Sequence, residues 1–193
     1  SILAAGNTVI IKPSSWASLS MLTMAEVLHE AGFPPGVVNI VTGSGSEVGT
    51  ALVESPLVDM VSMTGGTDTG RKVISDSSKT IKDVALELGG KSPNIVFPDI
   101  DWESAVKWTL LGFTLGSGQV CVSGTRLILH RSIYDRFLAQ LKVECEKLIP
   151  GDGFDCEREV NLPSLIHPDH AARVWSYIEK GKAEGARLIT GGV

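Results

Sequence analysis

The stretch 7–43, NTVIIKPSSWASLSMLTMAEVLHEAGFPPGVVNIVTG, contains a complete strand–helix–strand unit. Residues 7–12 are rich in Val and Ile, which is typical of a buried strand. Residues 18–32 place apolar side chains at helical spacing, between a serine expected to cap the helix and a C-terminal glycine. A turn and a second strand follow over 34–43. A helix that connects two neighbouring strands predicts that these strands run parallel.

The same alternation of strands and helices continues along the chain. Helices are expected at 46–55, 66–78, 99–115, 132–149 and 168–186, and strands at 58–63, 82–88, 92–97, 125–130 and from 187 onward. The 99–115 helix is apolar enough to be expected largely buried. The fold class is therefore α/β: an open parallel sheet with flanking helices, Rossmann-like in its first half, joined to the start of a second α/β domain. The glycine-rich stretch 86–93, LELGGKSP, is the expected boundary, which gives domains 1–87 and 88–193.

Composition limits the class of protein. The chain has 193 residues, of which 43% are apolar and 20% charged, as in a globular protein with a real core. The 17 basic and 22 acidic residues give a net charge of −5, without a basic run. A nucleic acid or an anionic membrane surface is therefore not expected as a partner. No apolar run approaches the roughly 20 residues that a membrane span needs.

Cysteine and histidine usage indicates neither a disulfide framework nor a metal site. Cys121, Cys145 and Cys156 lie far apart without a CxxC motif, which fits a reducing cytoplasm. His167 and His170 have a spacing that could bind a metal, but no cysteine or carboxylate cluster accompanies them. We expect these two histidines to flank the start of a helix.

Small and hydroxyl residues follow three of the expected strands, in KPSS (12–15), TGSGSEVG (42–49) and TGGTDTG (64–70). Parallel sheets bind ligands beyond the C-terminal ends of their strands, and helix N-termini there offer N–H groups to phosphate. The three loops together predict a nucleotide site, although glycines also terminate strands without binding anything. Lys12 could contact a ribose or phosphate, or be an ordinary strand-end cation.

Two side chains are candidates for catalysis. Glu87 lies between apolar residues, and burial there would raise its pKa toward the range that a general base needs; the alternative is an exposed edge residue. Cys121 lies in GSGQVCVSGTR (116–126), where small neighbours leave room for a substrate and free N–H groups for an oxyanion. The alternative is an inert core cysteine. The residues by themselves leave both questions open.

Taken together, these segments resemble the aldehyde dehydrogenase superfamily over essentially the whole chain. LAAGNTVIIKPS, GFPPGVVNIVTGSGSEVGTAL and VSMTGGTDTGRKV resemble segments of its cofactor domain. LELGGKSPNIVF resembles the glutamate signature of the family, and GQVCVSGTR resembles its cysteine signature. The order and separation of the two signatures make the resemblance specific.

The resemblance implies oxidation of an aldehyde to a carboxylic acid with NAD or NADP. Cys121 would attack the aldehyde, hydride transfer would leave a thioester, and Glu87 would activate the water that hydrolyses it. The Cys121 N–H would supply half of the oxyanion hole. The resemblance also implies a cytoplasmic homodimer or homotetramer. The implied cofactor contacts are Lys12, Ser14 and Ser15 at the ribose, Gly45 and Gly49 near the adenine, Gly65, Gly66 and Thr67 at the pyrophosphate, and Leu88 at the nicotinamide amide.

The chain departs from the family pattern at several positions. Ser15 stands where many NAD-preferring members have a glutamate that repels a 2′-phosphate, so NADP is expected to be tolerated. Gly66 replaces a serine, Gly116 replaces an asparagine, and NLPSLI (161–166) replaces a GPLI run. The asparagine of the oxyanion hole, the segment that holds the nicotinamide ribose and the oligomerisation strands are expected outside residues 1–193. These residues alone are therefore expected to be a nearly inactive piece of a larger protein.

Two other functions remain open. A CoA-acylating semialdehyde dehydrogenase shares the fold and the cysteine but usually lacks the hydrolytic glutamate, so Glu87 weighs against it. A non-catalytic protein on the same scaffold would not need both Cys121 and Glu87, although the departures at Gly66 and Gly116 are compatible with it.

Overall fold

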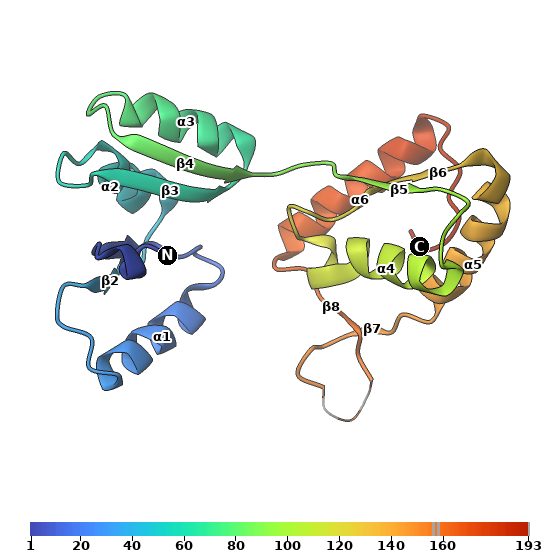
Figure 1. Cartoon of the computed structure of the whole chain (residues 1–193), viewed down its shortest axis with the longest axis horizontal. Helices are drawn as coiled ribbons and strands as arrows, with labels where there is room; N and C mark the ends of the chain where they lie inside the picture. The colour runs from blue at the N-terminus through green and yellow to red at the C-terminus, as the bar shows by residue number, and fades with distance from the viewer. Residues whose placement is uncertain (156, 158, 193) are drawn as a thin grey trace. The chain divides into compact units, whose positions relative to one another are not determined.

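The computed structural model describes residues 1–155, 157 and 159–192, and Cys156 therefore lies outside the described residues. The chain divides into two compact units, Ser1–Leu88 and Gly89–Val193. The division falls within the glycine-rich stretch 86–93. Each unit is described by itself (Figure 1).

The first unit consists of two strand–helix–strand motifs and a connecting helix. Their elements are β1 (Val9–Ile11), α1 (Ser18–Glu30), β2 (Val38–Ile40), α2 (Thr50–Glu54), β3 (Met60–Gly65), α3 (Thr67–Ser77) and β4 (Asp83–Leu88), with a 3₁₀ turn at Leu3–Ala5 and a π-helical turn at Gly45–Gly49. β1 pairs parallel with β2, and β3 pairs parallel with β4 up to the partners Gly65 and Leu88. The C-terminal ends of β3 and β4 therefore lie side by side, with α3 beginning directly after β3 (Figure 1).

The second unit contains one further motif of this kind, followed by two helices. Its elements are β5 (Pro93–Val96), α4 (Trp102–Thr114), β6 (Arg126–Leu129), α5 (Tyr134–Glu146), β7 (Pro150–Gly151), β8 (Leu162–Pro163) and α6 (Pro168–Ala183), with 3₁₀ turns at Leu115–Gly118 and Arg131–Ile133. β5 and β6 pair parallel from Pro93 and Arg126 to Val96 and Leu129. β7 and β8 form a parallel pair of two residues each.

The core of the second unit lies between β5, α4 and α5. Its buried side chains are Val96, Val106, Ile133, Phe137 and Leu141. Phe137 is completely buried, and the Trp102 ring meets it edge to face at a centroid distance of 5.5 Å. The Arg136 guanidinium covers the Trp102 ring at 4.1 Å, a favourable cation–π geometry. These contacts fix α5 against the start of α4.

The expected fold class is confirmed, because the strands alternate with helices and every strand pair is parallel. The strands of the described residues hydrogen-bond two by two, rather than as one continuous sheet. Among the described residues, no helix has the length and apolar character that crossing a membrane requires.

Three details of the sequence prediction are wrong. Ser18 does not cap α1: it is the first helical residue, and its Oγ donates to the Ser14 carbonyl at 3.0 Å. α4 is not largely buried. Its own apolar side chains point in all directions, but only one side of the helix packs on the core, and Trp108 is 63% exposed. No strand forms in the described residues 187–192, whose bonds go to helix side chains instead: Thr190 Oγ1 donates to Glu146 Oε1 at 3.0 Å.

Candidate functional site

Lys12 and the loop after β2 come together at the strand ends of the first unit. The Lys12 Nζ donates to the Pro13 carbonyl at 2.7 Å and lies 3.5 Å from the Gly43 carbonyl. A Cβ at Gly49 would lie 3.8 Å from the Lys12 side chain. An ammonium group carries three donors, and among the described residues only these two carbonyls accept from Lys12, so its third N–H is available to a ligand.

The backbone of this loop depends on Gly43. Its φ is +147°, and a Cβ there would lie 2.4 Å from Val48 Cγ2. Ser44 caps the following helical turn by accepting the Glu47 N–H at 3.1 Å. At Gly45, by contrast, no described atom lies within 4 Å of the position that a Cβ would take. Gly43 therefore has a structural role, whereas Gly45 leaves open space above the loop.

We expect Gly43→Ala to destabilise the protein by about 2 kcal/mol, because the methyl group adds backbone strain and a clash with Val48. Gly45→Ala is the matched control and should change the free energy of unfolding by less than about 0.5 kcal/mol. Urea unfolding of the two variants measures both values. Equal stability of the two variants would contradict this assignment.

The N-terminus of α3 directly follows the C-terminal end of β3. Gly66 precedes the helix with an extended backbone, and no described atom lies within 4 Å of the place where its Cβ would be. Thr67 is the first helical residue. No described side chain caps this end of the helix, so the N–H groups of the first turn are available to an anion, which the macrodipole of the 11-residue helix favours.

Sequence reasoning missed Gly70, the third glycine of TGGTDTG. Gly70 is buried, and a Cβ there would lie 2.8 Å from Leu88 Cδ2 and 3.5 Å from Leu86 Cδ1. α3 can therefore pack closely on the end of β4. The signal was present in the sequence, because dinucleotide-binding loops use their last glycine for such helix–strand packing.

The two serines after Lys12 are exposed. The Ser14 Oγ accepts the Trp16 N–H at 3.3 Å, and the Ser14 carbonyl accepts from the Ser18 Oγ. Ser14 therefore shapes the turn into α1. Ser15 leaves its short side chain on the surface of that turn.

Glu87 is exposed, which is the second of the two alternatives given for this residue. Side chains alternate along a strand, and Leu86 and Leu88 both face Gly70 of α3. Glu87 therefore points to the opposite face of β4, where its register partner on β3 is Thr64.

Cys121 lies in an exposed turn of the second unit that follows α4. The Ser123 N–H donates to the Val120 carbonyl at 3.0 Å and closes the turn, with Cys121 and Val122 at its centre. Among the described residues, the N–H groups of these two central residues donate no hydrogen bond. The Cys121 thiol and a free N–H are thus presented together, which is the combination that attack on a carbonyl needs.

Three consecutive left-handed residues lead into this turn: Gly116 at φ +57°, Ser117 at +57° and Gly118 at +76°. For Ser117 this conformation costs about 1 kcal/mol. Its Oγ donates to the Pro163 carbonyl at 2.6 Å. Asparagine tolerates the left-handed region better than most residues, so Gly116 preserves a backbone path that asparagine could also adopt.

The other reactive side chains lie in structural positions. Burial raises the pKa of the half-buried Cys145 thiol, and the neighbouring Glu146 and Glu144 carboxylates raise it further. The His167 Nδ1 accepts the Asp169 N–H at 3.2 Å at the start of α6, as expected for a residue that flanks a helix. No cluster of three or more metal-ligating side chains occurs in the part of the chain that the structure describes.

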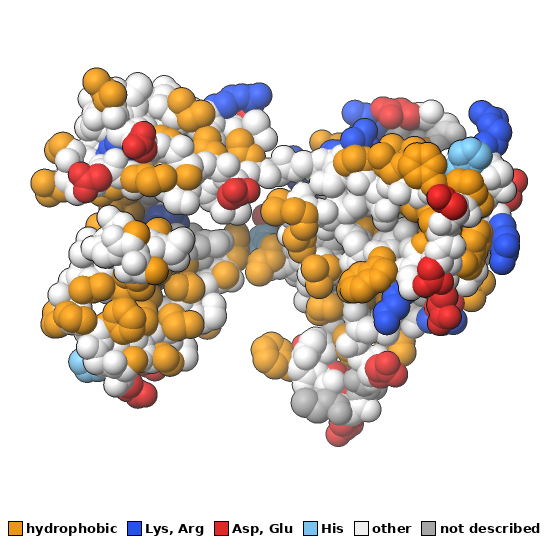
Figure 2. Space-filling view, viewed as in Figure 1, with side chains coloured by type: hydrophobic (Ala, Val, Ile, Leu, Met, Phe, Trp, Pro, Cys, Tyr) orange, Lys and Arg blue, Asp and Glu red, His pale blue; other side chains and the backbone are white. Residues whose placement is uncertain are grey.

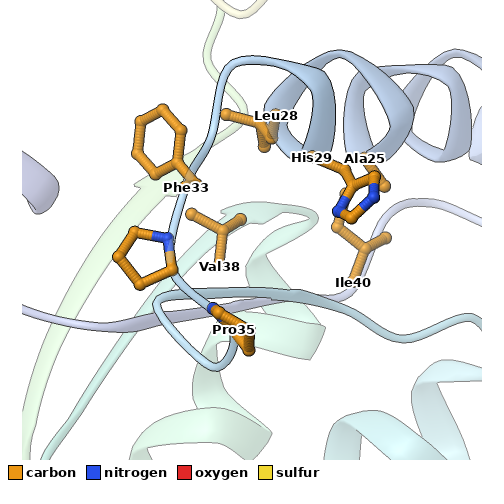
Figure 3. Close-up of a pocket in the computed structure, with 8 residues that line it drawn as sticks. Ala25, Leu28, His29, Phe33, Pro35, Val38 and Ile40 are labelled. Carbon is orange, nitrogen blue, oxygen red and sulfur yellow. The ribbon is translucent and has the colours of Figure 1, made fainter.

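Two surface hollows lie away from the candidate residues. A hollow of about 170 Å³ lies between α1 and β2, where Leu28, His29, Phe33 and Val38 line it (Figure 3). Apolar side chains gather over α1 on the surface of this unit (Figure 2). A second hollow of about 250 Å³ lies between β5 and α4. None of the expected site residues lines either hollow.

The model of the aldehyde dehydrogenase family matches residues 1–193. The chain belongs to the aldehyde dehydrogenase family. It is 45% identical over 190 residues to betaine aldehyde dehydrogenase of Bacillus subtilis, covering 98% of this chain and 38% of that protein. It is 48% identical to hydroxyisobutyraldehyde dehydrogenase of Mycolicibacterium austroafricanum, with 98% and 37% covered. The chain thus spans about 38% of the length of the curated relatives that it matches.

Solved aldehyde dehydrogenases have the same fold. The NAD⁺ complex of the Bacillus cereus aldehyde dehydrogenase matches with a TM-score of 0.95 at 41% identity, covering 98% of this chain and 38% of that one. Betaine aldehyde dehydrogenase from Staphylococcus aureus in complex with NAD⁺ matches with a TM-score of 0.92 at 39% identity, covering 98% and 37%. The arrangement of elements described above is therefore that of the corresponding part of an aldehyde dehydrogenase.

Proposed function

We propose that the whole protein oxidises an aldehyde to a carboxylic acid with NAD or NADP, and that Cys121 is its nucleophile. The observation that carries the proposal is the exposed Cys121 turn, where a thiol stands beside an N–H that donates to no described residue. Membership of the aldehyde dehydrogenase family supports it.

In this proposal the Cys121 thiolate attacks the aldehyde carbon, and the carbonyl oxygen becomes an oxyanion beside the Cys121 N–H. The nicotinamide cofactor, when bound, supplies the acceptor for the hydride, and a thioester remains on Cys121. Glu87 takes a proton from the water that attacks the thioester. The carboxylic acid leaves and the Cys121 sulfur is restored. The exposure of Glu87 leaves its carboxylate accessible to water.

The strand ends of the first unit offer groups that suit a dinucleotide. Lys12 retains a free N–H donor near Gly43 and Gly49, which suits ribose hydroxyls. The α3 N-terminus at Gly66 and Thr67 offers N–H groups to a pyrophosphate. The proposed contacts are Lys12, Ser14, Ser15, Gly45, Gly49, Gly65, Gly66, Thr67 and Leu88. The NAD⁺ complexes of related aldehyde dehydrogenases support this proposal.

The organisation of the protein is proposed on the same basis. Residues 1–87 would belong to the cofactor-binding domain and residues 88–193 to the catalytic domain. The whole protein would act in the cytoplasm as a homodimer or homotetramer.

A product assay tests the proposed reaction. Full-length protein, an aldehyde and NAD should yield the carboxylic acid, and addition of coenzyme A should not redirect the product. Formation of an acyl-CoA would instead establish the acylating reaction. A protein that binds NAD but oxidises none of a panel of aldehydes would be non-catalytic, and the proposal would be wrong.

We expect the wild-type protein to use NADP as well as NAD, because the exposed Ser15 carries no charge that repels a 2′-phosphate. Ser15→Glu should lower kcat/KM for NADP by about tenfold, since the added carboxylate would repel that phosphate. Its value for NAD should change little. Steady-state kinetics with both cofactors measure the ratio, with Ser15→Gln as the uncharged control. Strict use of NAD by the wild-type protein would contradict the expectation.

A further inference from the structure

The turn that carries Cys121 is tied to a distant segment by the side chain of Gln119. The Gln119 Oε1 accepts the Ile166 N–H at 3.0 Å, across 47 positions in the sequence. Its Nε2 donates to the Gly116 carbonyl at 3.1 Å. One amide group therefore joins the left-handed run before the turn to the segment after β8.

The two sides of the turn are anchored differently. On the C-terminal side, the Gly124 N–H donates to the Gly112 carbonyl of α4 at 2.9 Å, a bond that needs no side chain. On the N-terminal side, the links to distant parts of the unit come from side chains: Gln119 to Ile166, and Ser117 to the Pro163 carbonyl. The direction of the chain as it enters the turn therefore depends on these side chains.

We propose that Gln119 is a positioning residue for the oxyanion site, a role that rests on the proposed function of Cys121. Gln119 lies two residues before Cys121 and fixes the backbone that leads to its free N–H. Loss of the bond to Ile166 would let that backbone rotate, and the N–H would no longer point where the oxyanion forms. The thiol would remain exposed and reactive, because its exposure does not depend on Gln119.

Two reactions of Cys121 separate positioning of the N–H from general damage. Acylation by p-nitrophenyl acetate passes through an oxyanion and needs the N–H, whereas alkylation by iodoacetamide forms no oxyanion. In Gln119→Met, which has a similar length but neither hydrogen bond, acylation should slow about thirtyfold. Alkylation of Cys121 in the same full-length protein should remain within about twofold of the wild-type rate, since its thiol is unchanged.

Conservative and control variants sharpen the test. Gln119→Glu retains an acceptor for the Ile166 N–H but loses the donor to the Gly116 carbonyl, so acylation should recover in part, to about tenfold below wild type. Ser117→Gly suits the left-handed backbone and loses only the bond to Pro163, so it should fold and slow acylation in the same selective way. Gln140→Met is the matched control: it removes a glutamine that accepts from the Trp102 indole N–H, away from the turn, and should leave both rates unchanged.

The outcomes distinguish the two proposals. A selective loss of acylation in Gln119→Met with recovery in Gln119→Glu supports the positioning role. Wild-type acylation in Gln119→Met, an equal loss of both rates, or no recovery in Gln119→Glu overturns it. If Cys121→Ser is acylated as fast as the wild-type protein, the proposed nucleophile itself is wrong, whatever the Gln119 variants do.

Discussion

Cys121→Ser is expected to lower aldehyde oxidation by about a thousandfold or more, while the protein stays folded. Serine keeps roughly the size of the side chain, but an alcohol is a far weaker nucleophile than a thiol, because much less of it ionises near neutral pH. The measurements are NADH production by the full-length variant and thermal unfolding. Because Cys121 is exposed and its side chain fills no part of the core, the midpoint of unfolding should not change.

Cys145→Ser is the control for this experiment. Burial and two adjacent carboxylates raise the pKa of the Cys145 thiol, so little thiolate forms near neutral pH and the thiol should take no part in the reaction. Its replacement should leave the rate within about twofold. Substantial activity in Cys121→Ser, or loss of activity in Cys145→Ser, would show that the nucleophile has been assigned to the wrong residue.

Phe137→Ala should destabilise the second unit by about 3–5 kcal/mol, the largest stability effect that we expect. The ring is completely buried among Val96, Val106 and Leu141, so its removal leaves a cavity and breaks the edge contact with Trp102. A loss of this size is a large part of the total stability of a domain. Chemical unfolding followed by Trp fluorescence measures it.

Val143→Ala on the same helix is the control for the cavity. Val143 is 52% exposed and should lose less than about 1 kcal/mol. If the two variants unfold at the same denaturant concentration, Phe137 is not at the centre of a tightly packed core.

Sequence periodicity predicted most of the fold because each motif is local. In the stretch 7–43, the strand, the helix and the second strand are neighbours in sequence and in space, so the apolar pattern and the connection length determine the pairing. The strand expected from 187 onward does not form in the described residues, because its formation depends on more than the local sequence. A strand also needs a partner, and in the described residues that segment bonds to side chains of α5 and α6 instead.

The candidate site was predictable in residue type but not in geometry. Small residues at the strand ends indicated Lys12 and the loop 42–49 as parts of one site, and the structure brings these two together. The exposure of Glu87 was not predictable. Alternation along a strand places Leu86 and Leu88 on one face and Glu87 on the other, but it does not tell whether the face of Glu87 is covered. The role of Gln119 was also hidden, since no local pattern reveals a partner 47 residues away.

The left-handed run before Cys121 has a consequence for how this loop can diverge during evolution. At Gly116 selection acts first on the backbone dihedral, because most side chains are disfavoured at a φ of +57° whatever their chemistry. Glycine and asparagine both meet this requirement. Exchange of glycine for asparagine, or the reverse, adds or removes a polar side chain at position 116, before Cys121, without changing the course of the backbone. Drift at this position therefore leaves Cys121 in place, and related sequences can differ here while keeping the nucleophile proposed above.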